Sequence, residues 1–330
     1  MRYINSYEND AAIQAAVDNG ELGKPYVALN TERDEIDWNT KFVDYANMPL
    51  TFKITGDGLL NIKRPGNGYK YSLNNSEYID ITQSLSLSVK NGDIIRYKIP
   101  DWGKYYQTFQ NSTAGFIVYG NPKYGVNNID SSDFREIFSN CTGLTDARNL
   151  YLSSITLANS CYQRMFQGCT SLTTAPALPA TTLANNCYSQ MFEGCTSLTT
   201  APELPATTLT SSCYSSMFSG CTSLTTAPEL PATTLAQGCY SYMFNSCTSL
   251  TTAPSLPATT LASGYYTSMF QGCTNLNYIK CLAESGFGSN NGTYNWVRNV
   301  SSTGTFVKKA GVTWPSGASG IPNGWTVVEE

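Results

Sequence analysis

The chain has 330 residues and a formal net charge of −4, so it lacks the basic surface that binding to nucleic acid or an anionic membrane requires. No stretch approaches the roughly 18 consecutive apolar residues of a membrane-spanning helix, which predicts no membrane insertion. The first residues show neither the basic start nor the apolar core of a secretory signal peptide. The sequence therefore predicts either a protein held inside the cell until release or one whose signal has been removed.

Residues 1–48 predict a small βαβ segment. RYINSY indicates a strand, Asp10 can cap the helix AAIQAAVD, and Asn19-Gly20 can end it. PYVAL and EIDW then indicate two more strands. We expect this segment to be a cap, or the part that attaches the chain to other structural proteins.

Residues 49–125 predict an antiparallel β-sandwich, because seven short β-type runs alternate with turn sequences. Asn91-Gly92 is the strongest hairpin signal among these turns. The aromatic residues Trp102, Tyr105 and Tyr106 are candidate contacts for sugars. The alternative, which we favour, is that they pack in the core or between domains, because Tyr and Trp are usually largely buried.

The segment 126–286 repeats itself. A Met-Phe pair recurs every 26 residues, at 165–166, 191–192, 217–218, 243–244 and 269–270. A fixed period of this length indicates stacked structural repeats, here about six coils. The first unit, which contains Phe138, Cys141 and Leu144, departs from the others, as a capping repeat does.

Within one unit, Cys187, Met191 and Cys195 are spaced i, i+4, i+8, which predicts one apolar face of a short helix that Gly194 ends. The following APELPATTL predicts extended arms, because its prolines exclude a helix. We expect the arms of successive coils to pair in parallel. The predicted fold class is thus mixed β/α: a leucine-rich-repeat-like solenoid of 26-residue coils, preceded by the sandwich and the βαβ segment.

Ten of the eleven cysteines fall in two columns of the repeat, at 141, 169, 195, 221, 247 and 273 and at 161, 187, 213 and 239. A cysteine that recurs at one apolar position predicts a reduced, buried side chain stacked on its own copy. A metal site is disfavoured, because the chain contains neither histidine nor a CxxC pair. Residues 287–330 contain Trp296, Trp314 and Trp325 and predict a C-terminal cap over the last hydrophobic layer.

CTSLTTAPELPATTL followed by CYxxMFxGC resembles the BspA-type leucine-rich repeat, which occurs in many copies in surface proteins of gut bacteria and in phages that infect them. The resemblance covers Phe138 to about Gly286, and the tail from Trp296 to Glu330 is similar to that family's C-terminal cap. It implies a role in adhesion and binding, and it supplies no catalytic residues. The units here are longer than many repeats of the family.

No enzyme signature is present, and we predict that the chain has no cofactor. The absence of histidine rules out Ser-His-Asp and Cys-His pairs. Glu203 and Glu229 occupy one repeat position, so their environments should be alike, whereas a glycosidase needs two carboxyls with different pKa values. Threonine pairs recur in both arms, and one threonine of each pair is expected to face outward. Such an array could bind ice or a crystalline polysaccharide, but ordinary exposed strand residues are the favoured interpretation.

Binding specificity is expected where the copies differ. These positions are mostly small and polar, and the candidate ligand surface consists of Arg164, Gln190, Glu193, Glu203, Ser216, Glu229, Tyr242, Asn245 and Gln271. Only Arg164 and Tyr242 have the side-chain type of a strong binding anchor. Many copies on one particle would compensate for weak single contacts.

These observations favour a non-enzymatic binding protein on a particle surface. The leading hypothesis is a phage virion component of the tail, fibre or capsid decoration, assembled in the host cytoplasm, that contacts a glycan or protein of the host cell surface. The expected partners are that ligand, other structural proteins through the N-terminal region, and other copies of the chain. The alternatives are a bacterial cell-surface adhesin and a purely structural virion decoration.

Overall fold

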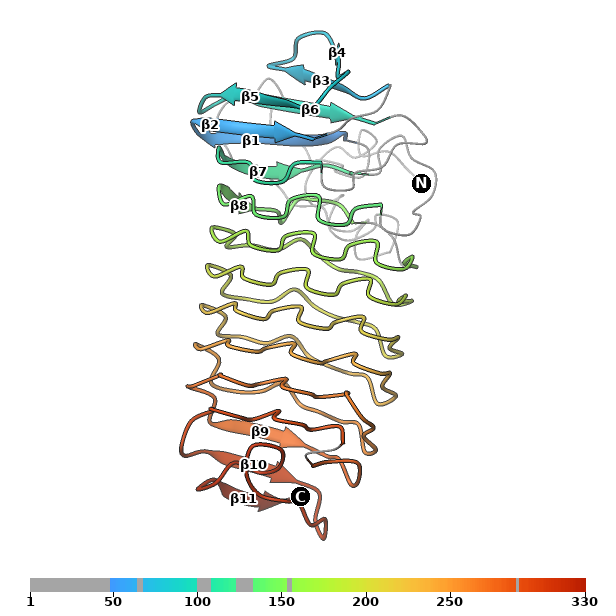
Figure 1. The fold of residues 1–330 in the computed structure, drawn as a ribbon, viewed down its shortest axis with the longest axis vertical. Helices are drawn as coiled ribbons and strands as arrows, with labels where there is room; N and C mark the ends of the chain where they lie inside the picture. Colours follow the sequence, from blue (N-terminus) through green and yellow to red (C-terminus); the bar gives the residue numbers. More distant parts are fainter. Residues whose placement is uncertain (1–47, 64–67, 100–107, 123–132, 153–155, 289–290) are drawn as a thin grey trace, which may run out of the picture.

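The computed structural model describes residues 48–63, 68–99, 108–122, 133–152, 156–288 and 291–330. The predicted βαβ segment, apart from Met48, and the residues Trp102, Tyr105 and Tyr106 lie outside the described residues. The described chain forms a long column (Figure 1). Two sheets stand at its N-terminal end, layers of stacked chain fill its middle, and a third sheet closes its C-terminal end.

All regular elements of the described residues are β-strands. The mixed β/α, leucine-rich-repeat-like solenoid class is therefore wrong, because the short helices that define it are absent from the described residues and the fold there is all-β. The strands are β1 Leu50–Gly56, β2 Gly58–Ile62, β3 Lys70–Leu73, β4 Ile79–Asp80, β5 Leu85–Val89, β6 Ile94–Lys98, β7 Gly115–Tyr119, β8 Leu144–Asp146, β9 Tyr278–Cys281, β10 Thr305–Lys308 and β11 Thr326–Glu329.

The N-terminal end contains a six-stranded sheet in the order β4-β3-β6-β1-β7-β8 and a two-stranded sheet of β2 and β5. Their pairs are antiparallel except for β7 and β8, which run parallel. The turn at Asn91-Gly92 is present, since the Asp93 N–H donates to the Lys90 carbonyl at 3.0 Å. The hairpin predicted there is wrong, because β5 pairs with β2 and β6 pairs with β1 and β3. The turn carries the chain from one sheet to the other.

The segment predicted as a helix in each repeat is a run of four-residue turns. In 186–194 the left-handed backbone recurs every fourth residue, at Asn186 (φ 57°), Gln190 (φ 59°) and Gly194 (φ 73°). A helix would keep all these residues right-handed. Spacing of i, i+4, i+8 suits both structures locally, but in a helix each step of four residues drifts by about 40°. A repeated four-residue turn has no such drift, so its apolar row stays straight.

Backbone N–H groups in these turns donate alternately within the layer and to the next layer. The N–H of Met191 donates to the carbonyl of Tyr188 at 3.2 Å, and the N–H of Phe192 donates to that of Met217 at 2.9 Å. The same alternation holds in the neighbouring units. Each layer therefore satisfies half of these donors only when another layer lies beside it, which a helix would not require.

The extended arms of successive layers pair in parallel at single bridges rather than over continuous strands. The bridges include Thr200 with Thr226 and Thr208 with Thr234. The Ala-Pro and Leu-Pro sequences beside them explain the interruption, because proline has no N–H to donate to a ladder. The parallel direction that we expected is confirmed.

The expectation that one threonine of each pair faces outward is wrong. Thr199 and Thr200 are both exposed, because strict alternation of side chains needs a continuous strand.

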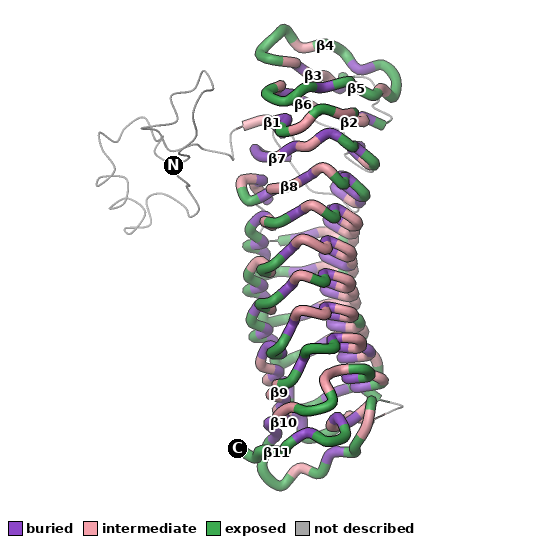
Figure 2. The backbone as a smooth tube through the Cα atoms, turned by 90° about the vertical axis from the view of Figure 1, so that its left-hand side faces the viewer, coloured by how far each residue is buried: buried purple, intermediate pink, exposed green. Residues whose placement is uncertain are grey.

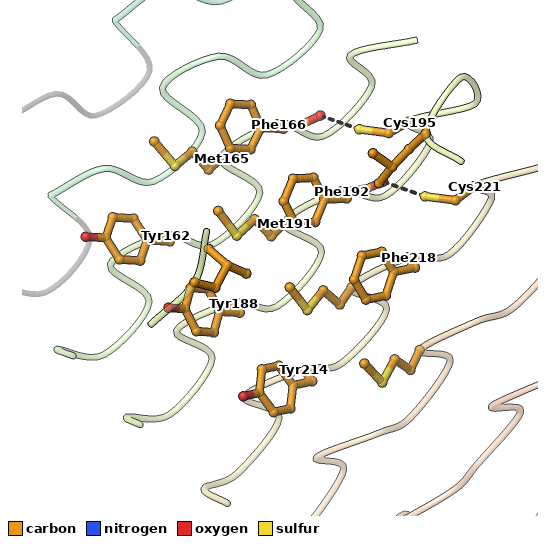
Figure 3. Packing of buried hydrophobic residues seen from close by; sticks show 14 of the residues in the cluster. Tyr162, Met165, Phe166, Tyr188, Met191, Phe192, Cys195, Tyr214, Phe218 and Cys221 are labelled. Atoms are coloured by element: carbon orange, nitrogen blue, oxygen red, sulfur yellow. Dashed lines mark hydrogen bonds between the residues drawn. The ribbon is translucent and has the colours of Figure 1, made fainter. Parts of the chain in front are cut away.

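The interior of the column consists of side chains stacked on their own copies. Figure 3 shows the phenylalanine and tyrosine rows. Ring centroids lie 5.4 Å apart for Phe166 and Phe192 and 5.9 Å apart for Tyr188 and Tyr214. Figure 2 shows that buried residues recur at the same positions in successive layers. The predicted core position of the cysteines is confirmed, because all eleven are buried with free thiols.

One cysteine column also links the layers by hydrogen bonds. The thiol of Cys195 donates to the carbonyl of Phe166 at 3.2 Å, and the thiol of Cys221 donates to that of Phe192 at 3.1 Å (Figure 3). The Phe166 carbonyl also accepts the N–H of Cys169 at 3.1 Å. A side chain that is small, apolar and still able to donate fits this position, and cysteine combines these properties.

The stacking extends beyond the repeated sequence at both ends. Phe109 is fully buried, and its ring stacks on Phe138 at 5.8 Å. At the other end, Trp296 is fully buried against Tyr266, with 6.2 Å between ring centroids, and its indole N–H donates to the Gly320 carbonyl at 2.8 Å. β9, β10 and β11 pair in parallel beside this ring and continue the arms.

Candidate binding surface

Most variable positions of the repeat lie on the outer side of the four-residue turns. We call this surface the turn face and define it by the outward side chains of residues 160–168, 186–194, 212–220, 238–246 and 264–272. The second exposed surface is the arm face, which carries the threonine pairs and the prolines between them. Seven of the nine predicted ligand residues are on the turn face, and the remaining two, Glu203 and Glu229, are on the arm face.

One column of the turn face has left-handed backbone in every repeat. It contains Arg164 (φ 57°), Gln190 (φ 59°), Ser216 (φ 55°), Tyr242 (φ 58°) and Ser268 (φ 50°). Non-glycine residues in this conformation cost roughly 1–2 kcal/mol each. The hydrogen bonds to both neighbouring layers hold the backbone there, so the side chain at this column is free to differ between copies.

Arg164, Gln190 and Glu193 come together, but they bind one another. The Arg164 Nε–H donates to Gln190 Oε1 at 2.9 Å, and the Gln190 amide donates to Glu193 Oε2 at 2.6 Å. The Gln167 amide donates to the same carboxylate oxygen at 2.7 Å. Arg164 also forms an ion pair at 3.6 Å with Glu136, a nearly buried carboxylate. These groups link adjacent layers, and much of their capacity to bind a ligand is already used.

Ser216, Tyr242, Asn245 and Gln271 occupy the C-terminal part of the turn face. Ser216, Asn245 and Gln271 are half-buried, whereas 43% of Tyr242 is exposed. The Ser246 hydroxyl donates to Asn245 Oδ1 at 3.1 Å. Tyr242 is thus the most prominent of the predicted ligand residues on this face.

Glu203 and Glu229 are exposed and lie in adjacent layers of the arm face. In the described residues they take part in no hydrogen bond or ion pair. Their equivalent positions in neighbouring layers agree with the expectation that their environments are alike. The structure therefore separates this pair from the turn-face residues with which the sequence analysis grouped it.

Two further side chains of the C-terminal cap join the turn face, and sequence reasoning missed them. Tyr294 is 47% exposed, and Arg298 is exposed one four-residue turn later. Their layer receives hydrogen bonds from the last repeat, since the Ser268 N–H donates to the Tyr294 carbonyl at 2.8 Å. The segment TYNWVRN carries no repeat motif, so nothing in the period placed it on this face.

The buried thiols and phenols are not poised for chemistry. Desolvation by burial raises the pKa of Cys141 and of Cys281 to about 12 and that of Cys213 to about 11. Thiolate, the nucleophilic form, is thereby disfavoured in the folded protein. The residues that the structure describes contain no group of three or more Cys, Asp or Glu side chains placed to hold a metal ion. Within the same ranges, no helix is long and apolar enough to cross a membrane.

No protein-family model matches this chain, and comparisons with curated proteins and with solved structures found no significant match. The resemblance to BspA-type proteins therefore stays a prediction from the sequence. A proposal for the function of this chain therefore rests on its own sequence and structure.

Proposed function

We propose that this chain is a non-enzymatic binding protein, displayed on the surface of a phage virion, that contacts the host cell. The observation that carries the proposal is the division between interior and surface in the repeat layers. Interior columns keep the same residue in nearly every copy and are fully buried, as in the row from Phe138 to Phe270. The turn face outside them changes from copy to copy on a fixed backbone. A rigid frame with variable outward side chains suits recognition.

The free thiols support the virion version over the bacterial adhesin. All eleven cysteines are free and buried, although stacked copies bring cysteines of one column into adjacent layers. Proteins that mature in reducing compartments keep cysteines in this form, whereas exported proteins use them for disulfides. Assembly in the cytoplasm of an infected cell fits this pattern.

The first test locates the protein. Mass spectrometry of purified virions and of bacterial envelopes from the same culture should find the chain in the virions at a fixed ratio to the major capsid protein. Its presence in the envelope fraction alone would favour the bacterial adhesin and overturn the virion proposal.

The second test separates recognition from decoration. Virions produced from a genome with a stop codon early in this gene should adsorb to host cells at least about tenfold more slowly, and expression of the chain in trans should restore adsorption. Unchanged adsorption by particles that assemble without the chain would show that it is structural decoration only.

A further inference from the structure

Two exposed tyrosines lie close together where the last repeat meets the C-terminal cap. Six large hydrophobic side chains are exposed in the part of the chain that the structure describes, and Tyr242 and Tyr294 are the two on the turn face. The Tyr242 N–H donates to the Thr267 carbonyl at 2.8 Å, and the Ser268 N–H donates to the Tyr294 carbonyl at 2.8 Å. The tyrosines therefore flank the Thr267-Ser268 layer on either side, with their backbones roughly 10 Å apart at two layer spacings.

Ser268, which lies in the layer between the two tyrosines, adds little to the exposed surface. Only 2% of Ser268 is exposed, although Ser216 in the same column is half-buried. Tyr242 and Tyr294 are therefore the exposed side chains here, and the nearly buried Ser268 lies in the layer between them.

Arg298 supplies a charge beside the two tyrosines. It follows Tyr294 by four residues, and the Gly272 N–H donates to its carbonyl at 2.8 Å, which places it on the same outer side of the cap layer. Its side chain is exposed and takes part in no ion pair or hydrogen bond with the described residues. Arg164, in contrast, is engaged by Gln190 and Glu136. Arg298 is therefore available to an external anion.

The backbone at Tyr242 adds an independent observation. Tyr242 is the one aromatic residue with positive φ among the described residues, at 58°. That conformation disfavours a bulky side chain, and an exposed ring recovers little of the cost by burial. Serine occupies the same position at 216 and 268, so the fold does not need an aromatic there. Strain that the fold does not require points to a role in binding.

We propose that Tyr242, Tyr294 and Arg298 form the binding hot spot for a saccharide that bears a carboxylate. This inference rests on the proposed function and names its ligand class. Tyrosine rings offer an apolar face to the C–H side of a sugar and a hydroxyl to its polar edge. The guanidinium binds a carboxylate through two parallel hydrogen bonds. The amides of Asn245 and Gln271, in the two adjacent layers, can bond to sugar hydroxyls.

The size of this exposed surface favours a saccharide over a folded protein. A stable protein interface needs about 800 Å² on each partner, centred on several large anchors. Outside Tyr242, Tyr294 and Arg298, the turn face of the adjoining layers presents small polar side chains such as Ser216 and Asn245. An elongated, hydroxyl-rich ligand with one anionic group matches this composition.

The test uses the full chain on an array of immobilised oligosaccharides that carry carboxylates, together with their methyl esters as uncharged partners. We expect binding to one or more acidic saccharides and at least about tenfold weaker binding to the matching esters. Tyr242→Ser and Arg298→Gln should each weaken binding at least about tenfold. Thr207→Tyr is the control, because it adds an exposed ring on the arm face, away from the turn face, and it should leave binding unchanged.

Binding to no acidic saccharide, equal binding to the esters, or binding that survives both substitutions would overturn this inference. Thermal unfolding of each variant shows whether it is folded, and Tyr242→Ser restores a residue that two other copies already carry. Virions with Tyr242→Ser and Arg298→Gln should adsorb poorly. If these virions adsorb normally while virions without the chain do not, the hot spot is wrong and the proposed function stands.

Discussion

The N-terminal sheets and the repeat layers bury their cores by opposite means. In the sheets, each strand has its own sequence, and its partner is set by which side chains fit, as when Phe52 of β1 packs on Phe109 at 4.6 Å. In the repeat layers, the partner of a side chain is its own copy 26 residues away. Phe192, Phe218 and Phe244 thus stack at 5.7 Å in each step.

This difference explains the distribution of charge. Stacked copies place identical side chains in adjacent layers, so a charge in the repeated motif would face the same charge above and below, which is destabilising. Residues 156–276 contain four formally charged side chains, Arg164, Glu193, Glu203 and Glu229. Arg164 and Glu193 are held by hydrogen bonds to uncharged amides, and Arg164 also pairs with the opposite charge of Glu136 in the preceding layer. A repeat fold of this type therefore makes most of its surface polar with Ser, Thr, Asn and Gln, and its one pair of like charges in adjacent layers, Glu203 and Glu229, is exposed to solvent.

The largest expected effect comes from breaking the period. Deletion of residues 213–238 removes one unit and joins Ser212 to Cys239, so every column stays in register. Deletion of residues 213–225 removes half a unit and shifts all later columns. We expect the first variant to unfold cooperatively near the parent's temperature and the second to lose cooperative thermal unfolding, as followed by circular dichroism. Similar behaviour of the two variants would contradict stacking by equivalent layers. No deletion of a single strand among β1 to β7 should be tolerated in this way.

Alkaline pH should unfold the repeat layers before the sheets. Burial raises the pKa of thiols such as Cys141 from 9.0 to about 12, so stability from the protonated thiols is complete below pH 9 and is lost as the pH rises toward 12. As the pH rises above 9, unfolded thiols lose protons that folded thiols keep, so each of the ten thiols whose pKa burial raises favours the unfolded chain more strongly. Together they are expected to remove a large part of the stability of an ordinary domain, which is only about 5–15 kcal/mol.

Urea unfolding between pH 8 and 10.5 measures this loss. Cys239→Ala should reduce the number of protons released on unfolding by one. The predicted alkaline destabilisation would be contradicted by a free energy of unfolding that does not change across this pH range. It would also be contradicted by thiols that react with a disulfide reagent in the folded protein at pH 8.

Loss of one stacked ring should be costly. Phe218→Ala removes a fully buried phenyl group between two others and should lower the free energy of unfolding by about 3–5 kcal/mol. Leu59→Ala is the control in the sheets, where 44% of the side chain is exposed, and should change stability by less than about 0.5 kcal/mol. Chemical denaturation measures both. Equal effects would mean that the layers are not close-packed.

The smallest effect tests the left-handed column. Ser216→Gly should stabilise the protein by about 0.5–1 kcal/mol, because φ is 55° there and glycine adopts this conformation without strain. Ser215→Gly, one residue earlier and without positive φ, should destabilise by a similar amount through chain entropy. Opposite shifts in melting temperature are expected. If both substitutions destabilise the protein, the left-handed backbone at Ser216 is not strained.

The repeat and the identity of its buried columns could be read from the chain, because residues at a fixed period share one environment. Phe109 could also have been found this way, since Thr108-Phe109-Gln110-Asn111-Ser112 parallels Met165-Phe166-Gln167-Gly168-Cys169. Of the candidate site, Tyr242 was found and is now the centre of the proposed hot spot. Arg164, Gln190 and Glu193 were also found, but the sequence could not show that these side chains form hydrogen bonds with one another.

By itself, the sequence determined the 26-residue period, the buried rows of Leu, Met, Phe, Tyr and Cys, and the extended course of the proline-containing arms. Only the tertiary structure decided that the Cys187 to Cys195 segment forms turns instead of a helix. Spacing of four residues is compatible with both, and the choice depends on N–H groups whose acceptors lie in the next layer. The same contact between layers brings Tyr294 and Arg298 beside Tyr242, because hydrogen bonds join the last repeat to a cap that shares none of its sequence.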